Sequence, residues 1–156
     1  MNLVPIEQDG AVRIAAEDRS GSVPSVIEQT VALYQRRGFE PPWVGYLAEE
    51  HSVWVGTCGF AGPPANGQAE IAYFTFPGQE GRGVASRMAA QLLALTHAAA
   101  ALRGFVYIAH TLAQESASTG ILRRLGFTLL GTIVHPEDGT VWKWHKTNTQ
   151  PPSTLP

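Results

Sequence analysis

The sequence predicts a single α+β domain with a twisted mixed sheet of about seven strands and helices on both of its faces. At 156 residues the chain is long enough for one domain with a core and too short for two ordinary domains. Short apolar runs typical of strands alternate with longer helical patterns. Residues 70–109 read as a strand, a long helix and a second strand, an order that implies a right-handed crossover and parallel pairing.

The N-terminal third is expected to contribute a strand, two helices and a hairpin. The second helical pattern is the clearer one, because its apolar residues recur at helical spacing between Pro24, which suits a first turn, and Gly38, which suits a helix end. A stiff connector then leads into two extended runs that meet at a polar turn, as in a hairpin. In chain order these elements are a strand at 3–6, helices at 8–17 and 24–37, and strands at 43–49 and 52–60.

The remaining elements alternate strands with helices and close on a second hairpin. The third strand of the sheet is rich in aromatic and β-branched residues. The long helix after it is expected to place Val84, Met88 and Leu95 on one buried face. Asp138-Gly139 is a strong hairpin signal between the last two strands. These elements are strands at 70–76, 105–109, 127–134 and 140–144, and helices at 84–101 and 116–125.

Composition argues against nucleic-acid and membrane partners. The net charge is −2, whereas binding to phosphates needs a basic face. The longest mainly apolar stretch, residues 88–102, is too short to span a bilayer, and the N-terminus lacks the features of a signal peptide. The single cysteine, Cys58, lies in an apolar run and is interpreted as a core residue of a cytoplasmic protein. Residues 1–146 are expected to form the domain, and residues 147–156 a disordered tail.

The turn at residues 76–86, between the third strand and the long helix, is the clearest sign of a ligand site. Gly81 and Gly83 allow the backbone to approach a ligand closely. The first N–H groups of the following helix have no partner within the helix, and with the helix dipole they form an anion site suited to pyrophosphate. Arg82 either adds positive charge or points to solvent, and the small Ala85 leaves the turn open. No Lys-Ser/Thr pair follows the last glycine, which excludes the phosphate loop of nucleoside-triphosphate hydrolases.

Around this turn the sequence resembles the GNAT family of N-acetyltransferases, and within it the RimJ/RimL-like branch of ribosomal-protein acetyltransferases. The family segment Arg/Gln-x-x-Gly-x-Gly/Ala here reads Glu80-Gly81-Arg82-Gly83-Val84-Ala85. The branch's strand Glu-Ile-Gly-Tyr reads Glu70-Ile71-Ala72-Tyr73. A later Asn-x-Ala-Ser, followed by Leu-Gly-Phe, reads Glu115-Ser116-Ala117-Ser118 and Leu125-Gly126-Phe127. The resemblance covers residues 44–144. In two places the chain departs from the pattern, since Glu80 replaces Arg or Gln and Glu115 replaces Asn.

The resemblance implies acetyl-coenzyme A as the acyl donor and no metal. The backbone of residues 74–76 is expected to pair with the pantetheine arm like an added strand, and one of its N–H groups to serve the oxyanion. None of the histidines suggests a metal-ligand set in the sequence. The expected cofactor-binding residues are Phe74, Thr75, Phe76, Glu80, Gly81, Arg82, Gly83, Val84, Ala85, Ser86, Glu115 and Ser118.

Amide formation needs a neutral amine and a proton for the leaving thiolate. A lysine-like amine has a pKa of about 10.4 and an α-amine about 7.7–8.0, so the first needs a strong proton acceptor and the second little help. Glu70 is the candidate base, with a solvent-facing strand carboxylate as the alternative. By the resemblance Ser118 is the candidate donor, with a helix-start residue as its alternative. Tyr73 and Tyr107 are further donor candidates, and His110 is either a base at the cleft or a capping residue.

The acyl acceptor is the least defined part of the prediction. By the resemblance, the helix at 24–37 borders the acceptor cleft, and Tyr34, Phe39 and Trp43 either line it or hold the connector to the sheet. The predicted function is transfer of an acetyl group to a primary amine of a small molecule or a protein N-terminus. The alternative is a non-catalytic acyl-coenzyme A-binding module of the same fold. A homodimer through the closing strands is also considered.

Overall fold

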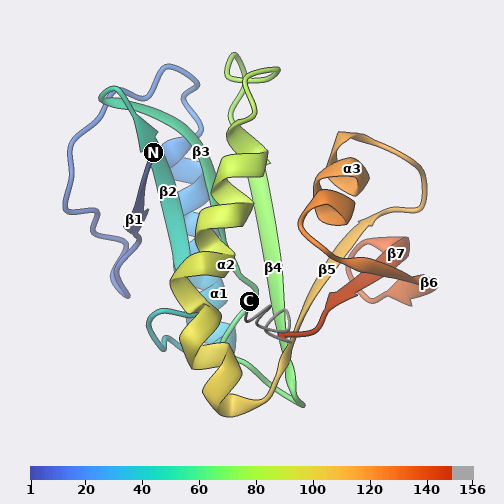
Figure 1. Ribbon diagram of the computed structural model, residues 1–156. Helices are drawn as coiled ribbons and strands as arrows, with labels where there is room; N and C mark the ends of the chain where they lie inside the picture. The colour runs from blue at the N-terminus through green and yellow to red at the C-terminus, as the bar shows by residue number, and fades with distance from the viewer. Residues whose placement is uncertain (149–156) are drawn as a thin grey trace, which may run out of the picture.

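The computed structural model describes residues 1–148, and in them seven strands form one mixed sheet with three helices (Figure 1). The strand order is β1-β2-β3-β4-β5-β7-β6, with every pair antiparallel except β4 and β5. The expected fold class is therefore confirmed. The strands are β1 Asn2–Pro5, β2 Gly45–Glu50, β3 Val53–Phe60, β4 Gln68–Thr75, β5 Val106–Leu112, β6 Thr128–His135 and β7 Gly139–Lys146; the helices are α1 Val23–Arg37, α2 Val84–Arg103 and α3 Ala117–Arg124.

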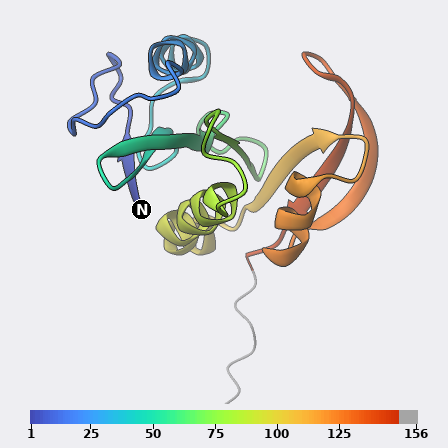
Figure 2. The same cartoon turned by 90° about the horizontal axis from the view of Figure 1, so that it is seen from above.

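The helices cover both faces of the sheet, as expected. Helix α1 lies on one face and α2 on the other, with α3 on the same side as α2 (Figures 1 and 2). No helix of the described residues is long and apolar enough to cross a membrane. Of the expected C-terminal tail, residues 149–156 lie outside the described part of the chain.

The expected helix at residues 8–17 is wrong, because this segment is a loop. Its start is a turn in which the Asp9 carboxylate accepts the Ala11 N–H at 2.9 Å, next to Gly10 with a φ of 88°. Its end is held in an extended form, since the Glu17 N–H donates to Ser52 and the Glu17 carbonyl accepts from the Trp54 N–H. Backbone bonds to Ser52 and the start of β3 thus replace the helical ones.

Helix α2 buries a different stripe from the one expected. Val84 and Met88 are buried as predicted, but Leu95 is 53% exposed and Thr96 takes its place inside. The Thr96 hydroxyl bonds the Leu92 carbonyl at 3.0 Å and the Tyr107 hydroxyl at 2.8 Å. Because α2 crosses a twisted sheet, its buried stripe moves around the helix along its length.

The parallel pair β4–β5 creates the opening that matters for function. The crossover through α2 was expected to give parallel pairing, and this is confirmed. In the described chain the ladder runs only from Gln68 to Glu70, opposite Val106 to Ile108. Beyond Glu70 the strands diverge (Figure 1), while β4 stays paired with β3 as far as Thr75. One edge of β4 therefore carries backbone groups that no neighbouring strand occupies.

The aromatic residues considered for the acceptor cleft belong to the core or its margin. Trp43 is 2% exposed and lies edge-on between Phe60 and Phe105. The buried Tyr34 hydroxyl donates to the Ile6 carbonyl at 2.8 Å and accepts the Gly45 N–H at 2.9 Å. Phe39 packs edge-on against the Tyr34 ring. Tyr34 and Trp43 thus hold α1 and its connector to the sheet and offer no surface to an acceptor.

Cys58 should be chemically inert in the folded protein. It is buried in the core, as expected, and burial raises the pKa of its thiol to about 12. Since only the thiolate reacts, we expect alkylation by iodoacetamide at pH 8 to be at least about 100-fold slower in native than in urea-unfolded protein. Mass spectrometry against time measures both rates. Equal alkylation rates in native and unfolded protein would contradict the burial of Cys58.

Candidate active site

A cleft of about 670 Å³ opens where β4 leaves β5 and faces α3. Its walls are the end of β4, the turn that follows, the first turn of α2 and the first half of α3. Most of these residues belong to the cofactor segments expected from the sequence. The lining residues are Tyr73, Phe74, Thr75, Gln79, Glu80, Gly81, Gly83, Val84, Ala85, Ser86, Ser116, Ala117, Ser118, Gly120, Ile121 and Arg124.

The turn before α2 has the backbone shape of an anion site. Gly81 and Gly83 have φ values of 76° and 71°, a region that side chains disfavour, and Gly83 is the N-cap of α2. The first backbone bond of the helix joins the Arg87 N–H to the Gly83 carbonyl. The N–H groups of Val84 and Ala85 therefore have no partner within the helix, and both residues line the cleft.

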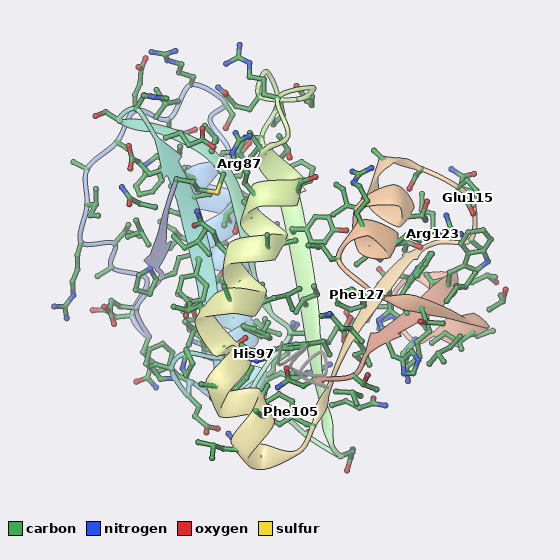
Figure 3. The ribbon with its side chains drawn as sticks, viewed as in Figure 1. Arg87, His97, Phe105, Glu115, Arg123 and Phe127 are labelled. Carbon is green, nitrogen blue, oxygen red and sulfur yellow. The ribbon has the colours of Figure 1, made fainter. Side chains whose placement is uncertain are left out.

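Arg87 holds this turn in place through hydrogen bonds of its guanidinium. Its Nη1 donates to the Arg82 carbonyl at 2.7 Å, and its Nη2 donates to the Glu50 carboxylate at 2.7 Å. The turn is thereby tied to the end of β2. Figure 3 shows Arg87 at the start of α2, beside the turn. Sequence reasoning missed this residue, since Glu50 lies 37 positions away.

The polar side chains of the turn take up different positions. Glu80 lines the cleft, and its carboxylate accepts the Gly78 N–H at 2.8 Å. The carboxylate is therefore bonded to the backbone of its own turn. Arg82 is not among the lining residues, and its guanidinium lies 3.5 Å from the Gln79 side-chain oxygen. Gln79, only 8% exposed, lines the cleft and was not singled out from the sequence.

Of residues 74–76, which were expected to bind pantetheine, two line the cleft and one does not. Phe74 and Thr75 line it, and the Phe74 side chain is 56% exposed. Phe76 was expected to bind pantetheine through its backbone, but its N–H already donates to Val55 and its carbonyl already accepts from Gln79. Its ring is fully buried. Phe76 therefore anchors the turn to the core, and its N–H is not free for a ligand.

Helix α3 presents Ser118 to the cleft. Ser116, and not Ser118, is the N-cap, in a reciprocal capping box with Thr119. This places Ser118 in the first turn, where it lines the cleft and its carbonyl accepts the Tyr73 hydroxyl at 3.2 Å. Burial raises the pKa of Tyr73 to about 12, so its phenol is a neutral donor. Tyr107 is 1% exposed and lies outside the cleft lining.

Glu115 does not reach the cleft. The Arg123 guanidinium donates two hydrogen bonds to its carboxylate, at 2.5 and 2.7 Å, and the Thr119 hydroxyl donates a third at 2.9 Å. These bonds hold the pKa of Glu115 at about 2. Glu115 and Arg123 lie on the side of α3 that faces away from β4 (Figure 3). The cation that lines the cleft is the neighbouring Arg124, which is not among the cofactor-binding residues expected from the sequence.

Glu70 lies at the closed end of the opening, where β4 and β5 part. Its Oε1 is 2.8 Å from Nδ1 of His110 on β5, and both side chains are partly buried. Glu70 is thus paired and not simply solvent-facing. The His110 ring in turn lies 5.0 Å, between centroids, from the ring of His135 on β6. The three residues are distant in sequence, so only the fold reveals their contact.

The comparisons with known proteins identify the family. Residues 5–128, well over half of the chain, match the family described as acetyltransferase (GNAT) domain. The chain therefore belongs to the GNAT acetyltransferase family. The expected family is confirmed. A comparison with curated protein sequences found no significant match.

Solved structures give this GNAT domain its structural neighbours. A ribosomal-protein-alanine N-acetyltransferase from Brucella melitensis is 23% identical, with a TM-score of 0.59 and coverage of 80% of this chain and 78% of that one. RimL, a ribosomal alpha-N-protein acetyltransferase in complex with coenzyme A, is 22% identical, with a TM-score of 0.60 and coverage of 81% and 71%. YncA, a putative acetyltransferase from Salmonella typhimurium with acetyl-CoA, is 21% identical, with a TM-score of 0.61 and coverage of 80% and 75%. At these identities the likeness establishes the fold.

Proposed function

We propose that this GNAT domain is an acetyl-coenzyme A-dependent N-acetyltransferase in which a primary amine attacks the thioester directly. One observation carries the proposal. The unpaired edge of β4 runs from an anion-binding turn at one end to the paired Glu70 and His110 at the other. An extended acyl donor with a phosphate group at one end and a reactive group at the other matches this arrangement.

The residues present fit the donor at three points. The turn from Gly81 to Ala85 supplies N–H groups for the pyrophosphate. Thr75 supplies backbone groups on the free edge of β4 for the amide-bearing pantetheine arm, in the manner of an added strand, whereas those of Phe74, like those of Phe76, face β3. Arg124 supplies a cation at the mouth of the cleft for a further phosphate. The two structural neighbours described as bound to coenzyme A or acetyl-CoA support this choice of donor.

The chain offers a backbone or side-chain group for each step of the transfer. Acetyl-coenzyme A supplies an activated thioester carbonyl. Glu70 accepts the proton of the attacking amine, directly or through a water, and His110 holds the Glu70 carboxylate in place. A free N–H of β4 donates to the oxyanion that forms as the N–C bond is made. The C–S bond then breaks, and the thiolate takes a proton from the Ser118 hydroxyl. Solvent then returns a proton to Ser118.

The same site supports a second candidate, a binding module that holds acyl-coenzyme A without turnover. Glu80 favours this alternative, because it brings a negative charge to the turn that would hold the pyrophosphate and takes up the Gly78 N–H. The acceptor itself is proposed only as a primary amine of a small molecule or a protein N-terminus. A cytoplasmic location and a homodimer remain predictions from the sequence.

A titration with acetyl-coenzyme A followed by a turnover assay separates the candidates. A ligand that binds only the folded state raises Tm, and at 100 times Kd it adds about 2.7 kcal/mol of stability. We expect acetyl-coenzyme A to raise Tm and a panel of amines to give acetylated product with release of free thiol. A rise in Tm with no product from any amine favours the module. No rise in Tm contradicts both.

Replacing Glu80 by glutamine should strengthen cofactor binding. The substitution keeps a side-chain oxygen for the Gly78 N–H but removes a negative charge from the pyrophosphate position. We expect Kd for coenzyme A to fall by about 3- to 10-fold at low salt, and the gain to shrink at high salt. Calorimetry at two salt concentrations measures both. Glu17→Gln, at an exposed carboxylate outside the cleft, is the matched control.

A further inference from the structure

Three side chains that can bind a metal ion, from three different strands, lie close together in the structure. Glu70 of β4, His110 of β5 and His135 of β6 each offer one ligand atom, and these atoms all lie within 4.8 Å of one another. Their side chains are 28%, 11% and 18% exposed. The group is therefore largely withdrawn from water while one side stays open. No spacing in the sequence indicates this metal set, because only the fold brings these positions together.

The chemistry of the three ligands selects a class of cation. Two imidazole nitrogens and one carboxylate oxygen suit Zn²⁺, Co²⁺, Ni²⁺ and Cu²⁺, whereas Mg²⁺ and Ca²⁺ prefer oxygen alone. Ligands about 2.0–2.1 Å from a tetrahedral zinc lie roughly 3.3 Å apart. The widest pair must therefore approach by at most roughly 1.5 Å. His135 can supply this movement, since it is the last residue of β6 before the hairpin turn.

His135 also has the support that a metal-binding histidine needs. Its Nδ1 lies 3.2 Å from the Asp138 carboxylate, and the backbone N–H groups of Glu137 and Asp138 approach the same atom at 3.2 and 3.3 Å. All of these contacts involve Nδ1, which accepts the two N–H groups, so the ring proton lies on Nε2. A cation that binds Nε2 requires this proton to move to Nδ1, which then gives up the two N–H bonds and donates to Asp138, as an outer carboxylate does for many metal-bound histidines.

We propose that Glu70, His110 and His135 bind one divalent cation of the zinc class, and that this binding reversibly inhibits acetyl transfer. The inhibition rests on the proposed function of Glu70, since a carboxylate bound to a cation is a weaker acceptor for the amine proton. Cation binding itself does not depend on that function. An open fourth position is left for water.

Cation binding is tested on chelator-treated full-length protein without any substrate. Co²⁺ is followed by its visible absorption and Zn²⁺ by calorimetry. We expect one cation per chain, and a loss of affinity of at least about 10-fold in His135→Asn and in His110→Asn. His97→Asn removes an exposed histidine of α2 (Figure 3) and should bind as the original protein does. Circular dichroism melts check that each variant is folded. Binding that is absent, or unchanged in folded His135→Asn and His110→Asn, overturns the site.

Inhibition is tested separately by the mass of the acetylated product, because released thiol itself binds zinc. We expect Zn²⁺ to stop turnover of the original protein, chelator to restore it, and His135→Asn to resist Zn²⁺ by at least about 10-fold in concentration. One bound cation with undiminished turnover overturns the inhibition. If no amine is acetylated under any condition, the proposed function is wrong. The cobalt absorption spectrum still shows whether the three residues bind a cation.

Discussion

Glu70→Gln should lower kcat by about 100-fold or more near pH 7 while leaving Kd for acetyl-coenzyme A unchanged. General bases of this kind contribute typically about 10²- to 10⁴-fold. Glutamine keeps the size of the side chain and an oxygen for His110 but cannot accept the amine proton. Cofactor affinity should not change, because Glu70 lies beyond the residues that line the cleft. Steady-state kinetics with a chosen amine, together with calorimetry, measures both quantities.

The pH dependence of this defect separates proton acceptance from a structural role. Above the pKa of the amine, about 7.7–8.0 for an α-amine, the acceptor is already neutral and needs no base. The deficit of Glu70→Gln should therefore shrink as pH rises through that range. Glu17→Gln should show no deficit at any pH. A Glu70→Gln enzyme with the original rate at all pH values would rule out Glu70 as the base.

Gly83→Val should raise Kd for acetyl-coenzyme A by at least about 10-fold. Gly83 is the N-cap of α2 with a φ of 71°, where a side chain costs roughly 1–2 kcal/mol, and each 1.4 kcal/mol is tenfold in affinity. A Cβ there would also lie 3.2 Å from Nη1 of Arg87, the atom that holds the turn. The N–H groups that face the phosphate would thus be displaced. Calorimetry with coenzyme A measures the change.

Gly67→Val is the matched control for this substitution. Gly67 has a φ of 72°, nothing within 4 Å of its Cβ position, and lies outside the residues that line the cleft. The same change in backbone strain should therefore lower stability without altering Kd. If both variants lose affinity equally, or if Gly83→Val binds as the original protein does, the turn is not the phosphate site.

The sequence predicts the elements well where local patterning decides them. The ten elements of the structure were expected with their boundaries within three residues, because apolar runs, Gly and Pro mark strands and helix ends locally. Patterning failed at residues 8–17, where backbone bonds to Ser52 and Trp54 hold the chain extended. It also failed at Leu95, because the twist of the sheet determines which side of α2 is buried.

The candidate site could be predicted only in its backbone part. The turn at Gly81 and Gly83 is local, so its glycines reveal it. The partners of its side chains are not local: Glu70 meets His110 from the next strand, and Arg87 meets Glu50 from β2. Glu115 was matched to a cofactor position by its place in a motif, yet Arg123 of α3, eight positions later, holds its carboxylate away from the cleft.

Hydrogen–deuterium exchange with and without coenzyme A tests most directly that this cleft holds the donor. Bound donor should slow exchange in residues 72–75 of β4, residues 81–86 of the turn and residues 116–121 of α3, because their N–H groups become bonded or shielded from water. The β6–β7 hairpin and residues 1–20, which do not line the cleft, should exchange at unchanged rates. Protection confined to other segments, with none at 81–86, would contradict the account.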